Sequence, residues 1–255
     1  MPTDMHLSNR PATLLLFLLF AVAFAGSSAF EPLPAYGQTS APVAALAARA
    51  SAGKCTALAT APSRDQAVAC VQWVYDQSRS FQASFQQLFT VKAYATEKTS
   101  SGTVTFEKPG KMLWRYDRPQ NNRVVSDGTL MKVYEASNQQ MYEQPVEKSQ
   151  YPAALSFLTG TGKLAESFDF DVVPGDKVAF PGGYALVGTP KEPTPAYSKV
   201  LFYVDLGTSQ VRRVMIIDGQ GNRNRFDFVN PQFNVPIPPD TFRYVPPAGT
   251  TIVRP

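Results

Sequence analysis

The stretch Phe81–Tyr134 reads FQASFQQLFTVKAYATEKTSSGTVTFEKPGKMLWRYDRPQNNRVVSDGTLMKVY and carries the pattern that decides the fold. In its middle, Met112, Trp114 and Tyr116 fall on one side of an extended chain and Arg115 falls on the other. A period of two is typical of β-strands whose two faces meet different surroundings. The same alternation recurs toward the C-terminus, which predicts a large sheet with one aromatic face.

Eleven segments of the chain have a strand pattern. Asp127-Gly128, between two of them, is a two-residue hairpin signal. Short strands joined by turns favour one antiparallel barrel or sandwich over alternating α/β units. The proline-rich tail, 234–249, suits the surface or an edge of the sheet better than its centre. The predicted strands are 85–94, 102–108, 112–117, 123–126, 130–135, 140–143, 168–173, 184–188, 199–205, 211–218 and 224–229.

Two segments are predicted to be helical, one before the first strand and one in the middle of the strand series. Ser63 followed by Gln66 has the form of a capping box, and predicts a helix that ends near Ser80. A second, apolar helix is expected over 153–158, between Pro152 and the glycines that follow it. A short apolar helix in the middle of a barrel sequence can cover an open end or fill the core.

The N-terminal third is expected to lie outside the fold. Residues 1–29 combine a weakly basic start, an apolar run too short to span a bilayer comfortably and small residues near the end, which predicts a signal peptide. The Pro- and Ala-rich residues 30–61 predict a flexible linker. The first cysteine, Cys55, lies far beyond the cleavage region, so no lipid-attachment site is expected. Residues 62–255 then form one exported, soluble domain.

Composition excludes several kinds of chemistry. His6 is the only histidine and lies in the predicted signal peptide. Removal of that segment excludes Ser-His and Cys-His nucleophiles and any His-ligated metal site. The net charge of +4 gives no reason to expect nucleic acid as a partner. We therefore expect no catalytic residue, no metal and no cofactor.

Cys55 and Cys70 are the two cysteines of the chain. An even pair in an exported protein predicts a disulfide. A redox-active pair is the alternative, but it lacks the C-x-x-C spacing.

Large apolar residues gather at the inward positions of the predicted strands. They suit either an ordinary packed core or the wall of a ligand cavity, because only larger or incompletely closed barrels leave room for a ligand. The pattern alone leaves both open. The residues are Phe85, Phe89, Phe106, Met112, Trp114, Tyr116, Phe226 and Phe228.

A series of short motifs, in order, resembles the periplasmic outer-membrane lipoprotein carrier family, LolA. Together they extend over nearly all of 66–252, although each motif alone is weak. They are FQASF at 81–85, GxVxF at 102–106, KP at 108–109 before Trp114, VSDG at 125–128, LTGxG at 158–162, GNxxRFDF at 221–228, NVPIP at 234–238 and FRYxPP at 242–247.

The resemblance implies a fold and roles for particular residues. The implied fold is an incompletely closed antiparallel β-barrel of about eleven strands covered by short helices. The eight inward residues named above would line a cavity for acyl chains. Leu155, Phe157 and Leu158 would belong to the lid. Lys108 matches a position where the family often has an arginine that ties the lid down, and lysine offers a point charge rather than a planar fork.

The resemblance also implies a function and partners. The expected protein is a monomeric, non-enzymatic periplasmic carrier that moves acylated lipoproteins from the inner to the outer membrane. Its partners would be those lipoproteins, an inner-membrane ABC lipoprotein-releasing complex and an outer-membrane lipoprotein acceptor. A lipoprotein-sensing or acceptor protein of the same fold is one alternative. A secreted lipid or glycan hydrolase is another, which the missing histidine and missing G-x-S-x-G motif disfavour.

Overall fold

The structure is a computed structural model that describes residues 55, 58, 60–148, 153–160 and 162–254. The predicted signal peptide, 1–29, and most of the predicted linker, 30–61, lie outside the described residues.

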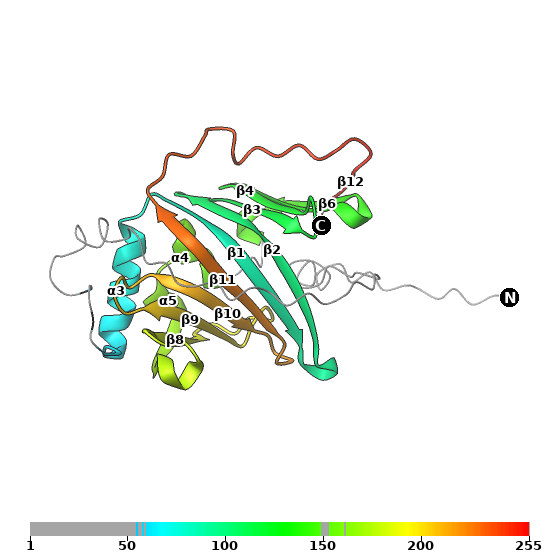
Figure 1. The fold of residues 1–255 in the computed structure, drawn as a ribbon. Coiled ribbons are helices and arrows are strands. Elements are labelled where there is room, and N and C mark those ends of the chain that lie inside the picture. Colours follow the sequence, from blue (N-terminus) through cyan, green and yellow to red (C-terminus); the bar gives the residue numbers. More distant parts are fainter. Residues whose placement is uncertain (1–54, 56–57, 59, 149–152, 161, 255) are drawn as a thin grey trace.

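Within the described residues, the strands form one twelve-stranded sheet in the order β12-β6-β5-β4-β3-β2-β1-β11-β10-β9-β8-β7. Neighbouring strands are antiparallel except β12, which pairs with β6 in parallel. Because β7 and β12 are the two ends of this order, the sheet does not close into a barrel (Figure 1). The predicted incompletely closed antiparallel architecture is confirmed, with twelve strands in place of about eleven. The strands are β1 (Ser80–Val91), β2 (Thr96–Glu107), β3 (Lys111–Arg118), β4 (Arg123–Asp127), β5 (Leu130–Glu135), β6 (Gln140–Pro145), β7 (Phe168–Pro174), β8 (Gly183–Pro190), β9 (Lys199–Asp205), β10 (Val211–Ile217), β11 (Arg223–Phe233) and β12 (Thr251–Val253).

The start of the sheet differs from the prediction. The first described helix ends at Asp76 instead of near Ser80, and β1 begins at Ser80 instead of at residue 85. The reason is visible in the burial of β1, where Phe81 and Ala83 already alternate with exposed residues. These positions also fit a helical face, and the sequence alone does not tell the two periods apart.

The strand β2 is also longer than predicted, because it starts at Thr96 and not at residue 102. Its first four residues are exposed on the sheet and pair with the end of β1, which makes a long hairpin. A strand that buries neither face has no period-two apolar pattern, so this extension left no signal in the sequence.

The twelfth strand lies in the proline-rich C-terminal region. The chain leaves the centre of the sheet at β11, crosses to the far edge and adds Thr251–Val253 beside β6 (Figure 1). The expectation that this region follows the surface or an edge is confirmed.

The three α-helices of the described residues lie on one side of the sheet (Figure 1). The Ser63 hydroxyl accepts a hydrogen bond from the backbone N–H of Gln66 at 3.4 Å, which caps the first helix as the sequence predicted. Within the part of the chain that the structure describes, no helix is long and apolar enough to cross a membrane. The helices are α3 (Arg64–Asp76), α4 (Ala153–Thr159) and α5 (Leu164–Ser167), with short 3-10 turns η1 (Lys92–Tyr94), η2 (Ala136–Asn138), η3 (Val146–Lys148) and η4 (Gly175–Val178).

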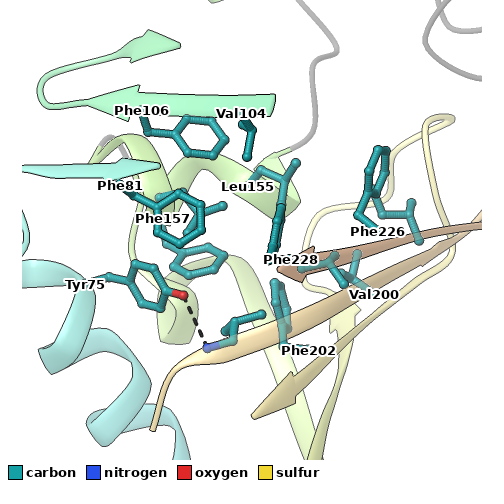
Figure 2. Packing of buried hydrophobic residues seen from close by; sticks show 14 of the residues in the cluster. Tyr75, Phe81, Val104, Phe106, Leu155, Phe157, Val200, Phe202, Phe226 and Phe228 are labelled. Carbon is teal, nitrogen blue, oxygen red and sulfur yellow. Dashed lines mark hydrogen bonds between the residues drawn. The ribbon is translucent and has the colours of Figure 1, made fainter. Parts of the chain in front are cut away.

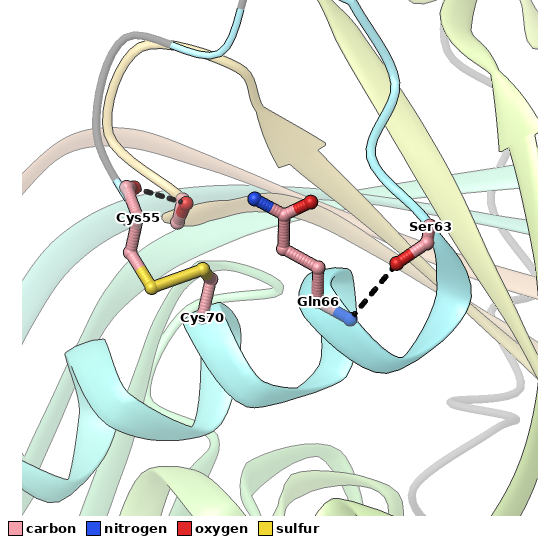
Figure 3. The surroundings of a disulfide bond; sticks show 5 residues. Cys55, Ser63, Gln66 and Cys70 are labelled. Atoms are coloured by element: carbon pink, nitrogen blue, oxygen red, sulfur yellow. Dashed lines mark hydrogen bonds between the residues drawn. A yellow bond between two sulfur atoms is a disulfide. The ribbon is translucent and has the colours of Figure 1, made fainter. Parts of the chain in front are cut away.

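The segment before α3 is attached to the domain at three points. Cys55 forms a disulfide with Cys70 of α3, with the two Cα atoms 5.1 Å apart (Figure 3). The backbone C=O of Cys55 accepts a hydrogen bond from the Ser209 hydroxyl at 2.7 Å. The N–H of Leu58 donates to the C=O of Leu206 at 3.1 Å. The part of the predicted linker that the structure describes therefore packs on the turn between β9 and β10.

Replacing both cysteines, Cys55→Ser with Cys70→Ala, should lower the free energy of unfolding by about 3 kcal/mol, because the cross-link restricts the unfolded chain. Chemical denaturation of the oxidised protein and of the double variant measures the difference. A reductant should shift the unfolding midpoint of the unsubstituted protein and leave that of the double variant unchanged. Identical midpoints for the oxidised and reduced unsubstituted protein would show that the disulfide does not form.

Candidate functional site

The inner face of the sheet is the face to which Met112, Trp114 and Tyr116 of β3 point. All three side chains are buried, whereas Arg115 between them is exposed. The alternation read from the sequence thus places the aromatic residues toward the helices. The other five residues predicted to line a cavity are buried as well: Phe85, Phe89, Phe106, Phe226 and Phe228.

Trp114 lies at the centre of an aromatic cluster that joins four strands. Its ring centroid is 4.9 Å from that of Phe85 on β1, 5.9 Å from that of Phe106 on β2 and 5.1 Å from that of Phe226 on β11. Phe228 follows at 6.4 Å. Offset and edge-to-face contacts at such distances are favourable. The Tyr116 ring joins the same cluster, with its centroid 5.1 Å from that of Phe85. The structure therefore brings together six of the eight residues singled out in the sequence, in one patch of the inner face.

The helix α4 inserts apolar side chains into this face. Its residues Leu155, Phe157 and Leu158 are all buried. The Phe157 ring makes edge-on contacts with Tyr75 of α3 at 4.8 Å and with Phe202 of β9 at 5.4 Å. Figure 2 shows Leu155 and Phe157 pointing into the cluster of rings from the sheet. The predicted lid residues thus fill part of the space over the inner face.

A buried tyrosine completes the contact between α3 and the sheet. The Tyr75 hydroxyl accepts a hydrogen bond from the backbone N–H of Val211 at 3.2 Å, as drawn in Figure 2. Burial raises the pKa of the Tyr75 phenol well above its ordinary value, so the hydroxyl stays neutral. The ring packs on Phe157 while its hydroxyl binds β10, and α3 therefore supports α4 from the side.

Lys108 lies where the two helices and β2 meet. Its ammonium donates a hydrogen bond to the backbone C=O of Tyr75 at the end of α3, with an Nζ–O distance of 2.5 Å. Its aliphatic stem runs directly under Gly160, where a Cβ atom would lie 2.7 Å from Lys108 Cδ. The residue predicted to anchor the lid therefore contacts the end of α4 through its stem, while the carbonyl it binds belongs to α3.

Gly160 is suited to this position for a second reason. Its φ of +76° lies in the left-handed region, which is unfavourable for residues other than glycine. One residue earlier, the backbone C=O of Thr159 accepts a hydrogen bond from the N–H of Gly110 at 3.0 Å. The C-terminal end of α4 is thereby tied to the turn between β2 and β3.

The charges around Lys108 are mixed. Burial lowers the pKa of its ammonium from the ordinary value, the Asp76 carboxylate opposes this shift and the Lys163 ammonium adds to it. Asp76 in turn binds Lys163, with an Nζ–Oδ2 distance of 2.9 Å at the surface. Burial raises the pKa of Asp76, but hydrogen bonds from Lys163 and Gln72 outweigh it and leave the pKa below its ordinary value. The end of α3 thus carries a small charged cluster beside Lys108.

One polar feature of the inner face was not predicted from the sequence. Gln87 of β1 and Asn224 of β11 are both buried, and the Gln87 amide Nε2 donates to Asn224 Oδ1 at 2.9 Å. The signal was present, because Gln87 has the same alternation phase as Phe85 and Phe89 and must therefore point inward. The inner face thus has an apolar part, which contains the aromatic cluster, and a polar part formed by the Gln87 and Asn224 amides.

No arrangement of metal ligands accompanies these residues. Across the described ranges, no three His, Cys, Asp or Glu side chains lie close enough to hold a metal ion.

Comparison with known proteins gives the same family that the motifs indicated. The family model described as outer membrane lipoprotein carrier protein LolA matches residues 76–245. An outer-membrane lipoprotein carrier protein of Bordetella avium is 28% identical over 204 residues, which cover 77% of this chain and 93% of the relative. The corresponding protein of Ralstonia nicotianae is 27% identical over 156 residues, 61% of this chain and 70% of the relative. A crystal structure of a LolA superfamily protein from Nitrosomonas europaea covers 72% of this chain and 99% of its own, with 11% identity and a TM-score of 0.42.

Lys108→Met should lower the free energy of unfolding by about 1 to 2 kcal/mol, because it removes a charged hydrogen bond to the end of α3 while it keeps the stem under Gly160. Lys163→Met is the matched control, since it removes an exposed ion pair worth less than about 1 kcal/mol. Urea denaturation of both variants measures the difference. Equal stability of the two variants would show that the Lys108 hydrogen bond to Tyr75 has no anchoring role.

Proposed function

The chain belongs to the LolA family of outer-membrane lipoprotein carrier proteins, and on this premise we propose that it binds the acyl chains of lipoproteins and carries them between membranes. The observation that supports the proposal is the apolar inner face of the sheet, part of which α4 covers. Leu155, Phe157 and Leu158 of α4 are buried in the same hydrophobic cluster as the rings of the sheet, and Phe157 contacts Phe202 of β9. In this proposal the acyl chains take the place of these side chains.

The energetics of acyl transfer favour such an exchange. Each CH₂ group of an acyl chain contributes about 0.8 kcal/mol to membrane binding, so a multiply acylated protein does not leave a bilayer unaided. Burial of one Leu or Phe side chain is worth about 1.5 to 3 kcal/mol. Replacing lid side chains by acyl chains exchanges one apolar contact for another. The acyl chains pass from one apolar surrounding to another, so the cost of loading is largely the cost of displacing the lid side chains, and this same cost favours release of the cargo.

The proposed cavity wall suits a fluid ligand. Aromatic rings and the Met112 thioether offer contact area without fixed hydrogen-bond demands, so chains of different length can pack on them. In this proposal the wall consists of eight residues that are buried in the closed form. They are Phe85, Phe89, Phe106, Met112, Trp114, Tyr116, Phe226 and Phe228.

The proposed lid is α4, held at its C-terminal end. The hydrogen bond between Gly110 and Thr159 and the packing of Gly160 on Lys108 are local contacts at one end of the helix. A helix held in this way can leave the inner face while the sheet keeps its pairing. The ligand would then shift the equilibrium toward the open form. The size of this shift equals the difference between its binding free energies for the open and the closed form.

The setting of the proposed function follows from the family and the predicted signal peptide at 1–29. The protein would work in the periplasm as a monomer and would act by binding rather than by catalysis. It would receive lipoproteins from an inner-membrane ABC lipoprotein-releasing complex, which supplies the energy of loading, and deliver them to an outer-membrane acceptor.

A fluorescent triacylated cysteine lipopeptide, offered in vesicles to the purified protein, should appear in a soluble 1:1 complex on size-exclusion chromatography. The physical reason is the match between its chains and the inner face. The same peptide without acyl chains is the control and should not elute with the protein. Retention of all the acylated peptide in the vesicle fraction would contradict the proposal.

A pair of variants locates the site. Trp114→Glu places a charge on the inner face and should abolish lipopeptide binding, whereas Arg115→Glu changes the neighbouring exposed position and should bind normally. Circular dichroism of both variants shows whether the sheet is kept. Undiminished binding by a folded Trp114→Glu variant would remove Trp114 from the site.

A further inference from the structure

Trp114 combines complete burial with an unused hydrogen-bond donor. Only 2% of its surface is exposed. Among the residues that the structure describes, no acceptor lies within hydrogen-bond distance of its indole Nε1. Its surroundings are the rings of Phe85, Phe106 and Phe226, and an aromatic face is at best a weak acceptor.

Such a donor has a cost in the closed form. A buried N–H without a partner loses its hydrogen bonds to water and costs about 1 to 3 kcal/mol. A phenylalanine would provide a similar aromatic wall without this cost. The packing of the closed form thus gives no reason for a nitrogen at this position, whereas a ligand that brings an acceptor does.

The other polar groups nearby do not serve this purpose. Gln87 and Asn224 lie on the same inner face, but they bind each other at 2.9 Å. Phe226 stands beside Asn224 on the same face of β11 and has its ring 5.1 Å from that of Trp114. Trp114 Nε1 is therefore an open donor in the zone where the apolar part of the inner face meets its polar part.

The chemistry of the cargo supplies a fitting acceptor. The proposed ligand is a lipid-modified protein whose chains are joined to glycerol through esters, and each ester has a carbonyl oxygen at the polar end of a long apolar chain. Moving such a carbonyl into an apolar interior is unfavourable unless a donor meets it. A single indole N–H among apolar rings meets this need without demanding a fixed chain length.

We propose that the Trp114 Nε1–H donates a hydrogen bond to an ester carbonyl of the bound acyl chains, so that the site prefers ester-linked chains over ether-linked chains of equal length. The inference rests on the proposed function, because it specifies which linkage the carrier recognises.

The test compares two diacylated lipopeptides that differ only in linkage, one with two ester-linked chains and one with two ether-linked chains. The unsubstituted protein should bind the ester form about five- to tenfold more tightly, as expected for one buried hydrogen bond. Trp114→Phe should reduce this ratio to about one, mainly by weakening the ester complex. Tyr184→Phe is the matched control, because the Tyr184 hydroxyl on β8 is another buried polar group without a partner among the described residues. That variant should keep the ratio.

A second measurement does not depend on any variant. In a ¹⁵N-labelled protein the indole N–H signal of Trp114 should move downfield when the ester form binds and should stay in place with the ether form. Equal affinity for the two lipopeptides, an unchanged ratio in folded Trp114→Phe, or equal indole shifts with both ligands would overturn the inference. Failure of the unsubstituted protein to bind either lipopeptide would instead overturn the proposed function, and the inference with it.

Discussion

An open sheet with one apolar face depends on something to cover that face. Here the order of the strands leaves β7 and β12 as free ends, and the aromatic residues of β1, β2, β3 and β11 all point to the same side. Exposure of such a face to water would be unfavourable by about 25 cal/mol for each square ångström. The helix α4 covers part of this face with Leu155, Phe157 and Leu158, which are themselves buried. The contacts of α3, Lys108 and the disulfide support this cover.

Support for the cover comes from few and local contacts. Tyr75 joins α3 to β10 by its hydroxyl and to Phe157 by its ring. Lys108 joins the end of β2 to the end of α3, and its aliphatic stem packs against Gly160. The disulfide between Cys55 and Cys70 fixes α3 from its outer side. The sheet and α3 thus form a frame, and α4 is held on that frame largely by apolar packing, which an acyl chain can replace.

The sequence predicted the sheet well because burial of one face imposes a period of two on the residues. The strands β5 and β9 match their predicted bounds, and the inward phase of Met112, Trp114 and Tyr116 is correct. Exposed strand ends, such as the start of β2, left no such pattern. The partner of Lys108 could not be predicted either, because the backbone carbonyl of Tyr75 comes to it only through the tertiary fold. The Gln87–Asn224 pair was readable in part, since the phase of Gln87 points inward, but its partner depends on the pairing of β1 with β11.

The central claim is that α4 and the acyl chains occupy the same apolar face in turn. Hydrogen exchange, followed by mass spectrometry on peptides that cover 153–160, tests it most directly. Binding of a diacylated lipopeptide should speed exchange in α4, because the helix leaves its packing, and should slow or leave unchanged the exchange in β1, β2 and β3. Slower exchange in α4 upon binding, or no change there in a saturated complex, would contradict the account.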